Sequence, residues 1–170
     1  MKVLLINGSP RKQGNTFLAL SEVASALEKQ GITTEIVSIG TKAVQGCIAC
    51  NKCGELGRCV FRDELYDTLH GKLAGADGLV VGSPTYNGQL YPPVDALLRK
   101  IAERCIPHRR FACFGSFTWA GAAVRRMTEF AEGMKWPVVG APVELKQGYS
   151  TAVEPACRTL VDALVEDMKR

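Results

Sequence analysis

Apolar residues along the chain gather in short runs, and these runs alternate with longer stretches in which apolar positions recur every three to four residues. The short runs predict strands at 2–6, 33–39, 78–81, 111–114 and about 138–145. The longer stretches predict helices at about 15–30, 63–74, 93–104, 120–133 and 154–169. Strands and helices are therefore expected to follow one another throughout.

This alternation predicts an α/β fold, a doubly wound parallel sheet with right-handed crossovers and helices on both faces. No internal repeat, low-complexity tract or linker-like change of composition interrupts residues 1–170. We expect one domain, with a strand order that is either flavodoxin-like or that of a dinucleotide-binding Rossmann fold. The residues of the loops at the carboxyl ends of the strands distinguish between these two strand orders.

The loop after the first strand, residues 8–16, lacks the Gly-x-Gly-x-x-Gly pattern that brings backbone close to a dinucleotide pyrophosphate. Instead it carries hydroxyl, amide and guanidinium groups on Ser9, Arg11, Asn15 and Thr16. With the amide groups and dipole of the following helix, these groups suit a terminal phosphate. The alternative is an ordinary capped turn, because small polar residues are common at helix starts.

Two further loops, residues 82–88 and 115–121, are small, polar and aromatic. All strands of a parallel sheet end at the same edge, so these loops converge with the first. Their backbone can hydrogen-bond a flavin, and Tyr86 or Trp119 can cover its ring; the alternative is that these aromatics pack or form a lid. The candidate ring-binding residues are Pro84, Thr85, Tyr86, Asn87, Gly88, Ser116, Phe117, Thr118, Trp119 and Gly121. A flavodoxin-like sheet of five strands in the order 2-1-3-4-5 follows.

The cysteine-rich segment at about 46–60 is the sharpest motif. Cys47, Cys50 and Cys53 are each separated by two residues, and Cys59 follows five residues later. Such spacing lets one loop present four thiolates to a [4Fe-4S] cluster, and Gly54 and Gly57 let the backbone turn. Positive charges on Lys52, Arg58 and Arg62 would raise the reduction potential of such a cluster, or they are solvated surface charges.

Three other interpretations of the four cysteines stay open. A structural zinc site usually pairs two Cys-x-x-Cys knuckles across a longer spacer, and this segment is short for that geometry. A redox disulfide between Cys50 and Cys53 has the right spacing but lacks the helix start expected after it. The third interpretation is a set of unligated thiols in a flavin reductase without a cluster.

The composition of the chain narrows the range of partners and locations that we expect. The chain has 170 residues, 46% of them hydrophobic, with a net charge of +4 and seven cysteines. The basic residues are scattered and no apolar stretch approaches the length of a membrane span, so we expect no nucleic-acid partner, no membrane partner and a cytoplasmic protein with reduced thiols.

The remaining chemistry-bearing residues are given structural roles. Cys105, Cys113 and Cys157 occupy apolar surroundings and are expected in the core, while His70 and His108 are expected on the surface. Neither a nucleophile elbow nor a pair of acidic residues at general acid–base spacing is present in the sequence, which makes hydrolase chemistry unfavourable.

The motifs of the first half resemble the iron-sulfur flavoproteins within the NAD(P)H-dependent FMN reductase group. The resemblance covers 1 to about 88 and rests on Gly-Ser-Pro-Arg at 8–11, Gly-Asn-Thr at 14–16, the cysteines at 47–59 and Gly-Ser-Pro at 82–84. Later motifs, Tyr-Pro-Pro at 91–93 and Phe-Gly-Ser-Phe at 114–117 with Trp119 and Gly121, resemble the flavodoxin domain of flavodiiron proteins. Both families bind FMN. The diiron centre of the second family belongs to another domain and is not expected here.

The resemblance implies an FMN-dependent oxidoreductase that relays electrons between FMN and a [4Fe-4S] cluster. It also implies a ferredoxin-like partner or NAD(P)H as the electron donor, and a homodimer or homotetramer. The alternative is an NAD(P)H-dependent FMN or quinone reductase without a cluster, and a non-enzymatic FMN-binding module is a third possibility. Reduction by NAD(P)H without a partner protein distinguishes the second from the first.

Overall fold

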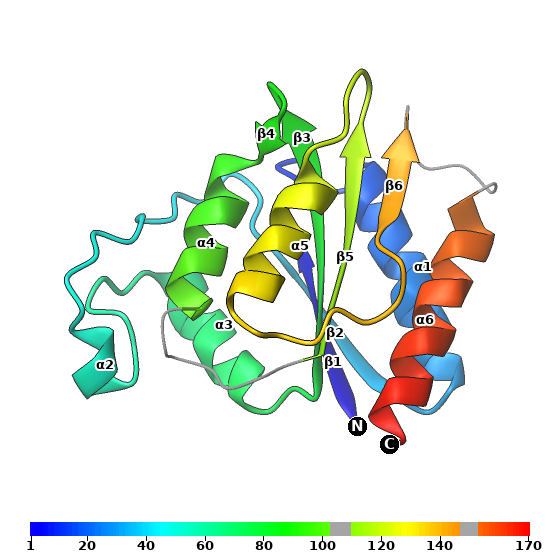
Figure 1. Ribbon diagram of the computed structural model, residues 1–170, viewed down its shortest axis with the longest axis horizontal. Coiled ribbons are helices and arrows are strands. Elements are labelled where there is room, and N and C mark those ends of the chain that lie inside the picture. The colour runs from blue at the N-terminus through cyan, green and yellow to red at the C-terminus, as the bar shows by residue number, and fades with distance from the viewer. Residues whose placement is uncertain (103–109, 147–152) are drawn as a thin grey trace.

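A computed structural model describes residues 1–102, 110–146 and 153–170, and Figure 1 shows its elements. The strands are β1 (Lys2–Asn7), β2 (Thr33–Ser38), β3 (Gly78–Tyr86), β4 (Gln89–Leu90), β5 (Arg110–Phe117) and β6 (Val143–Lys146). The helices are α1 (Asn15–Lys29), α2 (Cys53–Leu56), α3 (Glu64–Ala74), α4 (Pro92–Ala102), α5 (Ala123–Gly133) and α6 (Glu154–Met168).

The sheet has the strand order β2-β1-β3-β5-β6, and all of these strands are parallel. Since β5 and β6 are the fourth and fifth of the predicted strands, the predicted order 2-1-3-4-5 is confirmed. The short strand β4 lies off this path and pairs with the end of β3 in the antiparallel direction. The α/β flavodoxin-like fold class is confirmed with it.

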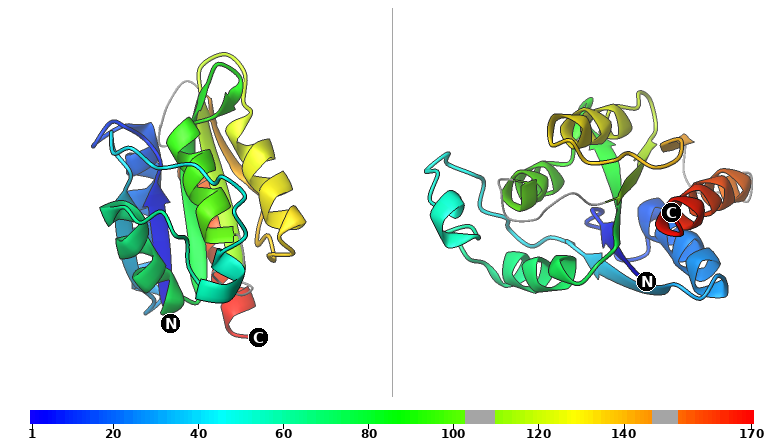
Figure 2. Two further views of the ribbon diagram at one scale, coloured as in Figure 1. Left: turned by 90° about the vertical axis from the view of Figure 1, so that its left-hand side faces the viewer. Right: turned by 60° about the horizontal axis from the view of Figure 1, so that its bottom comes forward.

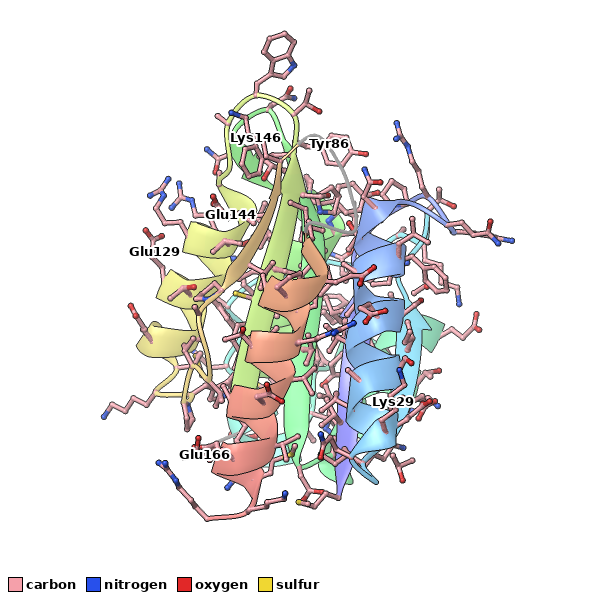
Figure 3. All side chains as sticks on the ribbon, turned by 90° about the vertical axis from the view of Figure 1, so that its right-hand side faces the viewer. Lys29, Tyr86, Glu129, Glu144, Lys146 and Glu166 are labelled. Carbon is pink, nitrogen blue, oxygen red and sulfur yellow. The ribbon has the colours of Figure 1, made fainter. Side chains whose placement is uncertain are left out.

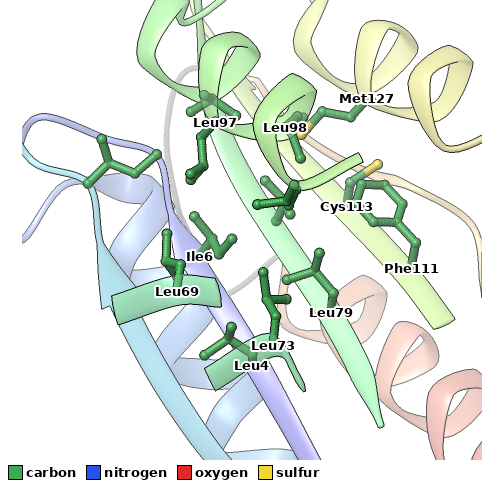
Figure 4. Packing of buried hydrophobic residues seen from close by; sticks show 14 of the residues in the cluster. Leu4, Ile6, Leu69, Leu73, Leu79, Leu97, Leu98, Phe111, Cys113 and Met127 are labelled. Carbon is green, nitrogen blue, oxygen red and sulfur yellow. The ribbon is translucent and has the colours of Figure 1, made fainter. Parts of the chain in front are cut away.

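Alternate residues of each central strand face opposite sides of the sheet, and this divides the core in two. Leu4 and Ile6 of β1 lie on the face that α3, α4 and α5 cover, in the core cluster that Figure 4 shows. Val3 and Leu5 pack instead with α1 and α6. All four side chains are completely buried. Strands buried on both faces are apolar at every position, which is why β1 appears in the sequence as a continuous apolar run.

The helices form one layer on each face of the sheet (Figures 1 and 2). Helices α1 and α6 lie side by side on one face, as Figure 3 shows, and α3, α4 and α5 cover the other. The short helix α2 and the chain on either side of it stand outside these layers, beyond α3 and α4. The cysteine-rich segment is therefore an addition to the layered fold.

Several predicted boundaries are wrong. Strands β3 and β5 still pair with each other at Pro84 and Ser116. Beyond that point β3 continues to Tyr86 by pairing with β4, and β5 continues to Phe117 by pairing with β6. Strand β6 begins at Val143 and not near 138: Val138 makes only an isolated bridge to Phe111, and a left-handed Gly140 (φ 72°) interrupts the backbone. Helix α5 begins at Ala123, three residues later than predicted.

Two elements were not predicted at all. The β3–β4 hairpin turns at Asn87 and Gly88, whose φ values of 48° and 68° fit a two-residue type I′ turn. Helix α2 begins at Cys53, within the segment expected to be a loop. The predicted end of the fourth helix at 104, and the predictions for Cys105 and His108, lie outside the described residues.

A search of the described ranges finds no helix with the length and apolar character that crossing a membrane requires.

Candidate functional site

A hollow opens where β1, β3 and β5 end, at the edge of the sheet where the prediction placed a flavin. Its volume is about 220 Å³, somewhat below the roughly 300–1,000 Å³ common for small-molecule sites. It is lined by Ser9, Arg11, Gly14, Asn15, Thr16, Pro84, Thr85, Tyr86, Ser116, Phe117 and Thr118. The structure thus brings together residues from three loops that are far apart in the sequence.

The first loop is held against β3 by a backbone hydrogen bond. The amide of Gly8 donates to the carbonyl of Gly82 over 2.8 Å. A Cβ atom on Gly8 would lie 2.7 Å from that carbonyl oxygen and 2.4 Å from Cγ2 of Val94. Only glycine therefore lets the loop lie this close to the end of β3.

Ser9 gives the loop its shape. Its amide donates to Oδ1 of Asn7 over 3.1 Å, and its Oγ accepts a hydrogen bond from the amide of Arg11 over 3.1 Å. The side chain of Asn7 is in turn tied to Ser38 of β2, since its Nδ2 donates to Oγ of Ser38 over 3.1 Å. The loop is thereby anchored to two strands while Arg11 stays exposed at the hollow.

The amino terminus of α1 faces the same hollow. Its N-cap is Gly14, which has no side chain to accept hydrogen bonds from the first-turn amides, and the first turn contains no acidic residue. Thr16 is buried, and its Oγ1 lies 3.2 Å from Oγ of Ser116 on β5. Uncapped amides, the positive end of the helix dipole and Arg11 together favour a bound anion.

The opposite wall of the hollow is formed by the ends of β3 and β5. Oγ1 of Thr85 accepts hydrogen bonds from the amides of Ala122 and Ala123 over 3.3 and 3.2 Å, so this side chain caps α5. Tyr86 is 41% exposed and its ring centroid lies 5.1 Å from that of Tyr91. Figure 3 shows Tyr86 at the end of the sheet. The wall offers backbone groups and two aromatic residues, Tyr86 and Phe117.

Four predicted ring-binding residues lie outside the lining of the hollow. Asn87 and Gly88 form the hairpin turn described above, and the side chain of Trp119 is 93% exposed. Gly121 is closely packed, because a Cβ atom at this position would lie 2.7 Å from Oε1 of Glu144 and 2.9 Å from Cε1 of Phe117. Flavin binding by these four residues stays a prediction.

The four clustered cysteines surround a second, separate pocket. Its volume is about 20 Å³, about the space of one water molecule, and its lining is Cys47, Ile48, Cys50, Cys53, Cys59, Val60, Phe61 and Lys100. The prediction that these cysteines come together is consistent with this arrangement. The wall is otherwise apolar, apart from the lysine.

The backbone of the cysteine-rich segment winds tightly around this pocket. Ala49 and Asn51 adopt left-handed conformations with φ of 55° and 58°, which are unfavourable for residues other than glycine. The amide of Ala49 donates to Sγ of Cys47 over 3.3 Å. The amide of Cys59 donates to Oη of Tyr66 on α3 over 2.9 Å. Backbone strain of this kind is typical of functional loops.

A positive charge that the sequence analysis missed lies at this pocket. Lys100 of α4 is only 2% exposed, and its Nζ donates to Oδ2 of Asp63 over 2.7 Å. Of the cations that were predicted, Lys52 and Arg58 are exposed. Arg62 pairs with Asp67 over 2.9 Å, and this hydrogen bond raises the pKa of Arg62 and lowers that of Asp67.

The four thiols line the pocket without forming a ready-made metal-binding group in the described part of the chain. Within 1–102, 110–146 and 153–170, no three His, Cys, Asp or Glu side chains are arranged to hold one. None of the described cysteines forms a disulfide. The donor set nevertheless suits an iron-sulfur cluster chemically, because four thiols and no carboxylate or imidazole surround one pocket with an apolar wall.

The other described cysteines and one histidine have structural surroundings. Cys113 and Cys157 are buried as predicted, and desolvation raises the pKa of each thiol to about 11. His70 was expected on the surface but is half-buried, with its ring centroid 5.6 Å from that of Tyr66. The reason is that Tyr66 and His70 lie one helical turn apart on the same face of α3.

Comparison with known proteins agrees with this architecture. A family model described as NADPH-dependent FMN reductase matches residues 1–142. An iron-sulfur flavoprotein of Methanocaldococcus jannaschii is 41% identical over 109 residues, which are 64% of this chain and 54% of that protein.

Solved structures show the same fold over the whole chain. One is the rubredoxin oxygen:oxidoreductase of Desulfovibrio gigas, with a TM-score of 0.77 and 21% sequence identity. The superposition covers 99% of this chain and 36% of the oxidoreductase chain. A flavodoxin from the Archaea covers 100% of both chains with a TM-score of 0.75 and 19% identity. The chain spans about half the length of the curated relatives it matches.

Proposed function

The chain belongs to the NADPH-dependent FMN reductase family, and from this premise we propose that it is an FMN-dependent oxidoreductase that relays electrons between FMN and a [4Fe-4S] cluster. One observation carries the proposal: the chain builds two separate sites, one suited to an anionic flavin and one formed by four thiols. A relative at 41% identity is named an iron-sulfur flavoprotein, which supports the pairing of these two groups.

FMN is the cofactor that the family and the flavodoxin-like neighbours support. Ser9, Arg11, Asn15 and Thr16 would hold its phosphate at the amino terminus of α1, where the first-turn amides and the guanidinium offset the negative charge. When bound, FMN supplies both hydride and single-electron chemistry.

The ring of FMN would lie against the ends of β3 and β5. Backbone groups of 84–86 and 116–118 would hydrogen-bond its polar edge, since the side chain of Thr85 is already engaged by α5. Tyr86, which contacts the ring of Tyr91, would cover one side of the flavin. The lining contains no carboxylate, imidazole or lysine, so these walls would bind and orient the ring without offering an acid–base group of that kind.

The four cysteines Cys47, Cys50, Cys53 and Cys59 would hold the cluster, which supplies one-electron chemistry when bound. Ile48, Val60 and Phe61 would give the cluster apolar neighbours, although all three side chains are themselves exposed. The tightly wound backbone around Ala49 and Asn51 presents several thiols from one short segment.

Partners and assembly are part of the proposal. We assign the role of electron donor to NAD(P)H or to a ferredoxin-like redox protein, and we expect a homodimer or homotetramer. Support for assembly comes from the position of the cysteine-rich segment outside the layers, beyond α3 and α4 (Figure 2). The hollow lies elsewhere, at the carboxyl edge of the sheet. A second copy would bring the thiols of one subunit toward the hollow of another.

Anaerobic reductive titration tests the proposal. Wild-type protein is expected to take up about three electrons per chain, two on FMN and one on the cluster. Cys50→Ser should take up about two, and the matched control Cys157→Ala, which changes a cysteine remote from the pocket, should keep about three. Uptake of two electrons by the wild type would contradict the proposal.

A second candidate, an NAD(P)H-dependent FMN or quinone reductase without a cluster, is favoured by the description of the matched family, which names NADPH. The same titration separates the two functions. Full reduction by NADPH alone, with two electrons per chain in both wild type and Cys50→Ser, supports the second candidate.

A further inference from the structure

Lys100 occupies an unusual position on α4. Its neighbours on the helix, Val94, Leu97, Leu98 and Ile101, form the apolar stripe that packs on the sheet. Of the residues described, Lys100 is the one charged residue that is buried. Removing an ammonium group from water costs several kcal/mol unless good partners compensate it.

Its partners tie α4 to the start of α3. Oδ2 of Asp63 accepts the hydrogen bond from Nζ, and Oδ1 of Asp63 accepts one from the amide of Tyr66 over 2.8 Å, which caps α3. Nζ also lies 4.6 Å from the centroid of the Tyr66 ring, a distance at which the ring attracts a cation. A buried ion pair of this kind adds little stability over an apolar pair of the same size, so stability alone does not account for it.

The same residues reach the cysteine pocket from two directions. Lys100 itself lines the pocket together with the four cysteines. The hydroxyl of Tyr66 accepts the hydrogen bond from the amide of Cys59. A chain of direct contacts thus joins Lys100, Asp63 and Tyr66 to the backbone amide of Cys59, the last of the four cysteines.

We propose that Lys100 is a positioning residue that places a buried positive charge beside the cysteine pocket and raises the reduction potential of the group bound there, with Asp63 limiting the effect. This inference rests on the proposed role of the four cysteines as cluster ligands. A cluster with four thiolates is negative and becomes more so when it accepts an electron, so a nearby cation stabilises the reduced form. Burial makes the charge of Lys100 more effective than those of the exposed Lys52 and Arg58, which water and salt screen.

The test is a potentiometric titration of the reconstituted protein, followed by the electron paramagnetic resonance signal of the reduced cluster. Lys100→Met keeps the length of the side chain and removes its charge. It should make reduction roughly tenfold less favourable, which corresponds to a potential about 59 mV more negative for one electron. Lys100→Arg should keep the potential near that of the wild type.

The variant Asp63→Asn is the second part of the same titration experiment. Asparagine still caps a helix, so α3 keeps its start, while the charge of Lys100 is no longer compensated. The potential should therefore become more positive, opposite to the change in Lys100→Met. Lys52→Met, which removes an exposed charge beside Cys53, is the matched control and should shift the potential by less than half as much as Lys100→Met.

The outcomes separate this inference from the proposed function. Shifts of opposite sign in Lys100→Met and Asp63→Asn support the role of Lys100. Shifts of the same sign, or an unchanged potential in both, overturn it. If Lys100→Met fails to retain the cluster, the direction of the shift in Asp63→Asn decides. A wild-type protein that assembles no cluster overturns the proposed function instead.

Discussion

At the scale of single residues, the first loop depends on glycine at position 8. We predict that Gly8→Ala destabilises the protein by about 1–3 kcal/mol, because the new Cβ would lie 2.7 Å from a backbone oxygen that cannot move without β3. It should also weaken FMN binding at least tenfold, since the loop is displaced from the hollow. Urea unfolding and fluorescence titration with FMN measure the two effects.

A matched control is available in α3. Gly71 is an exposed helical residue, and a Cβ atom at this position would have no neighbouring atom within 4 Å, so alanine fits there. Gly71→Ala should stabilise the protein by about 0.5–1 kcal/mol and leave FMN affinity unchanged. Equal destabilisation by Gly8→Ala and Gly71→Ala would contradict the role given to the first loop.

The sequence predicted some of the residues that line the two sites and missed one of them. Ser9, Arg11, Asn15 and Thr16 were found because a phosphate loop uses contiguous residues at a strand–helix junction. Lys100 was missed because a lysine on an amphipathic helix ordinarily lies on its solvated face. Its burial is decided by the packing of α4 against the start of α3, which no local pattern contains.

At the scale of elements, the outer strand β2 is tied to its neighbours by one carboxylate. Glu35 accepts hydrogen bonds from Lys72 of α3 and, over 3.0 Å, from Nζ of Lys2 of β1. These bonds, that of Lys72 first, lower the pKa of Glu35 from its ordinary value of 4.5. The two ion pairs of Glu35 thus hold β1, β2 and α3 together at this carboxylate.

The lowered pKa of Glu35 determines how this carboxylate affects the stability of the protein as the pH changes. A carboxylate with a lowered pKa contributes stability above its unfolded-state pKa and loses it as the pH falls through the folded-state value. Glu35→Gln should therefore cost less than about 1 kcal/mol at pH 7, a small value because the side chains are partly exposed. The difference from wild type in urea unfolding should shrink below about pH 4.5; a difference that grows on acidification would contradict the assignment.

The elements that the sequence failed to predict are the short ones. Strands β1, β2, β3 and β5 have six to nine residues and the five long helices have 11 to 15, which is enough for their periodicity to be visible. The start of β6, which has four residues, was misplaced. Strand β4 has two residues and α2 has four, so neither carries a periodic signal. The Asn87–Gly88 pair could have indicated the hairpin, because this dipeptide favours a type I′ turn.

At the scale of the whole molecule, the fold assigns the two sites to different places. The parallel sheet ends at a single edge and gathers three loops there, which form the hollow. The cysteine-rich segment leaves that edge after β2 and lies outside the helical layers, beyond α3 and α4 (Figure 2). The flavodoxin-like frame therefore positions the flavin site directly, whereas the cysteine pocket depends on contacts with α3 and α4.

The most direct test of two redox groups in one chain is to purify the protein without oxygen and measure FMN, iron and acid-labile sulfide per chain. We expect one FMN with about four irons and four sulfides, and a broad absorption shoulder at roughly 400 nm from the cluster thiolates. One FMN with no iron or sulfide, and a spectrum with flavin bands alone, would contradict it and leave a flavin reductase without a cluster.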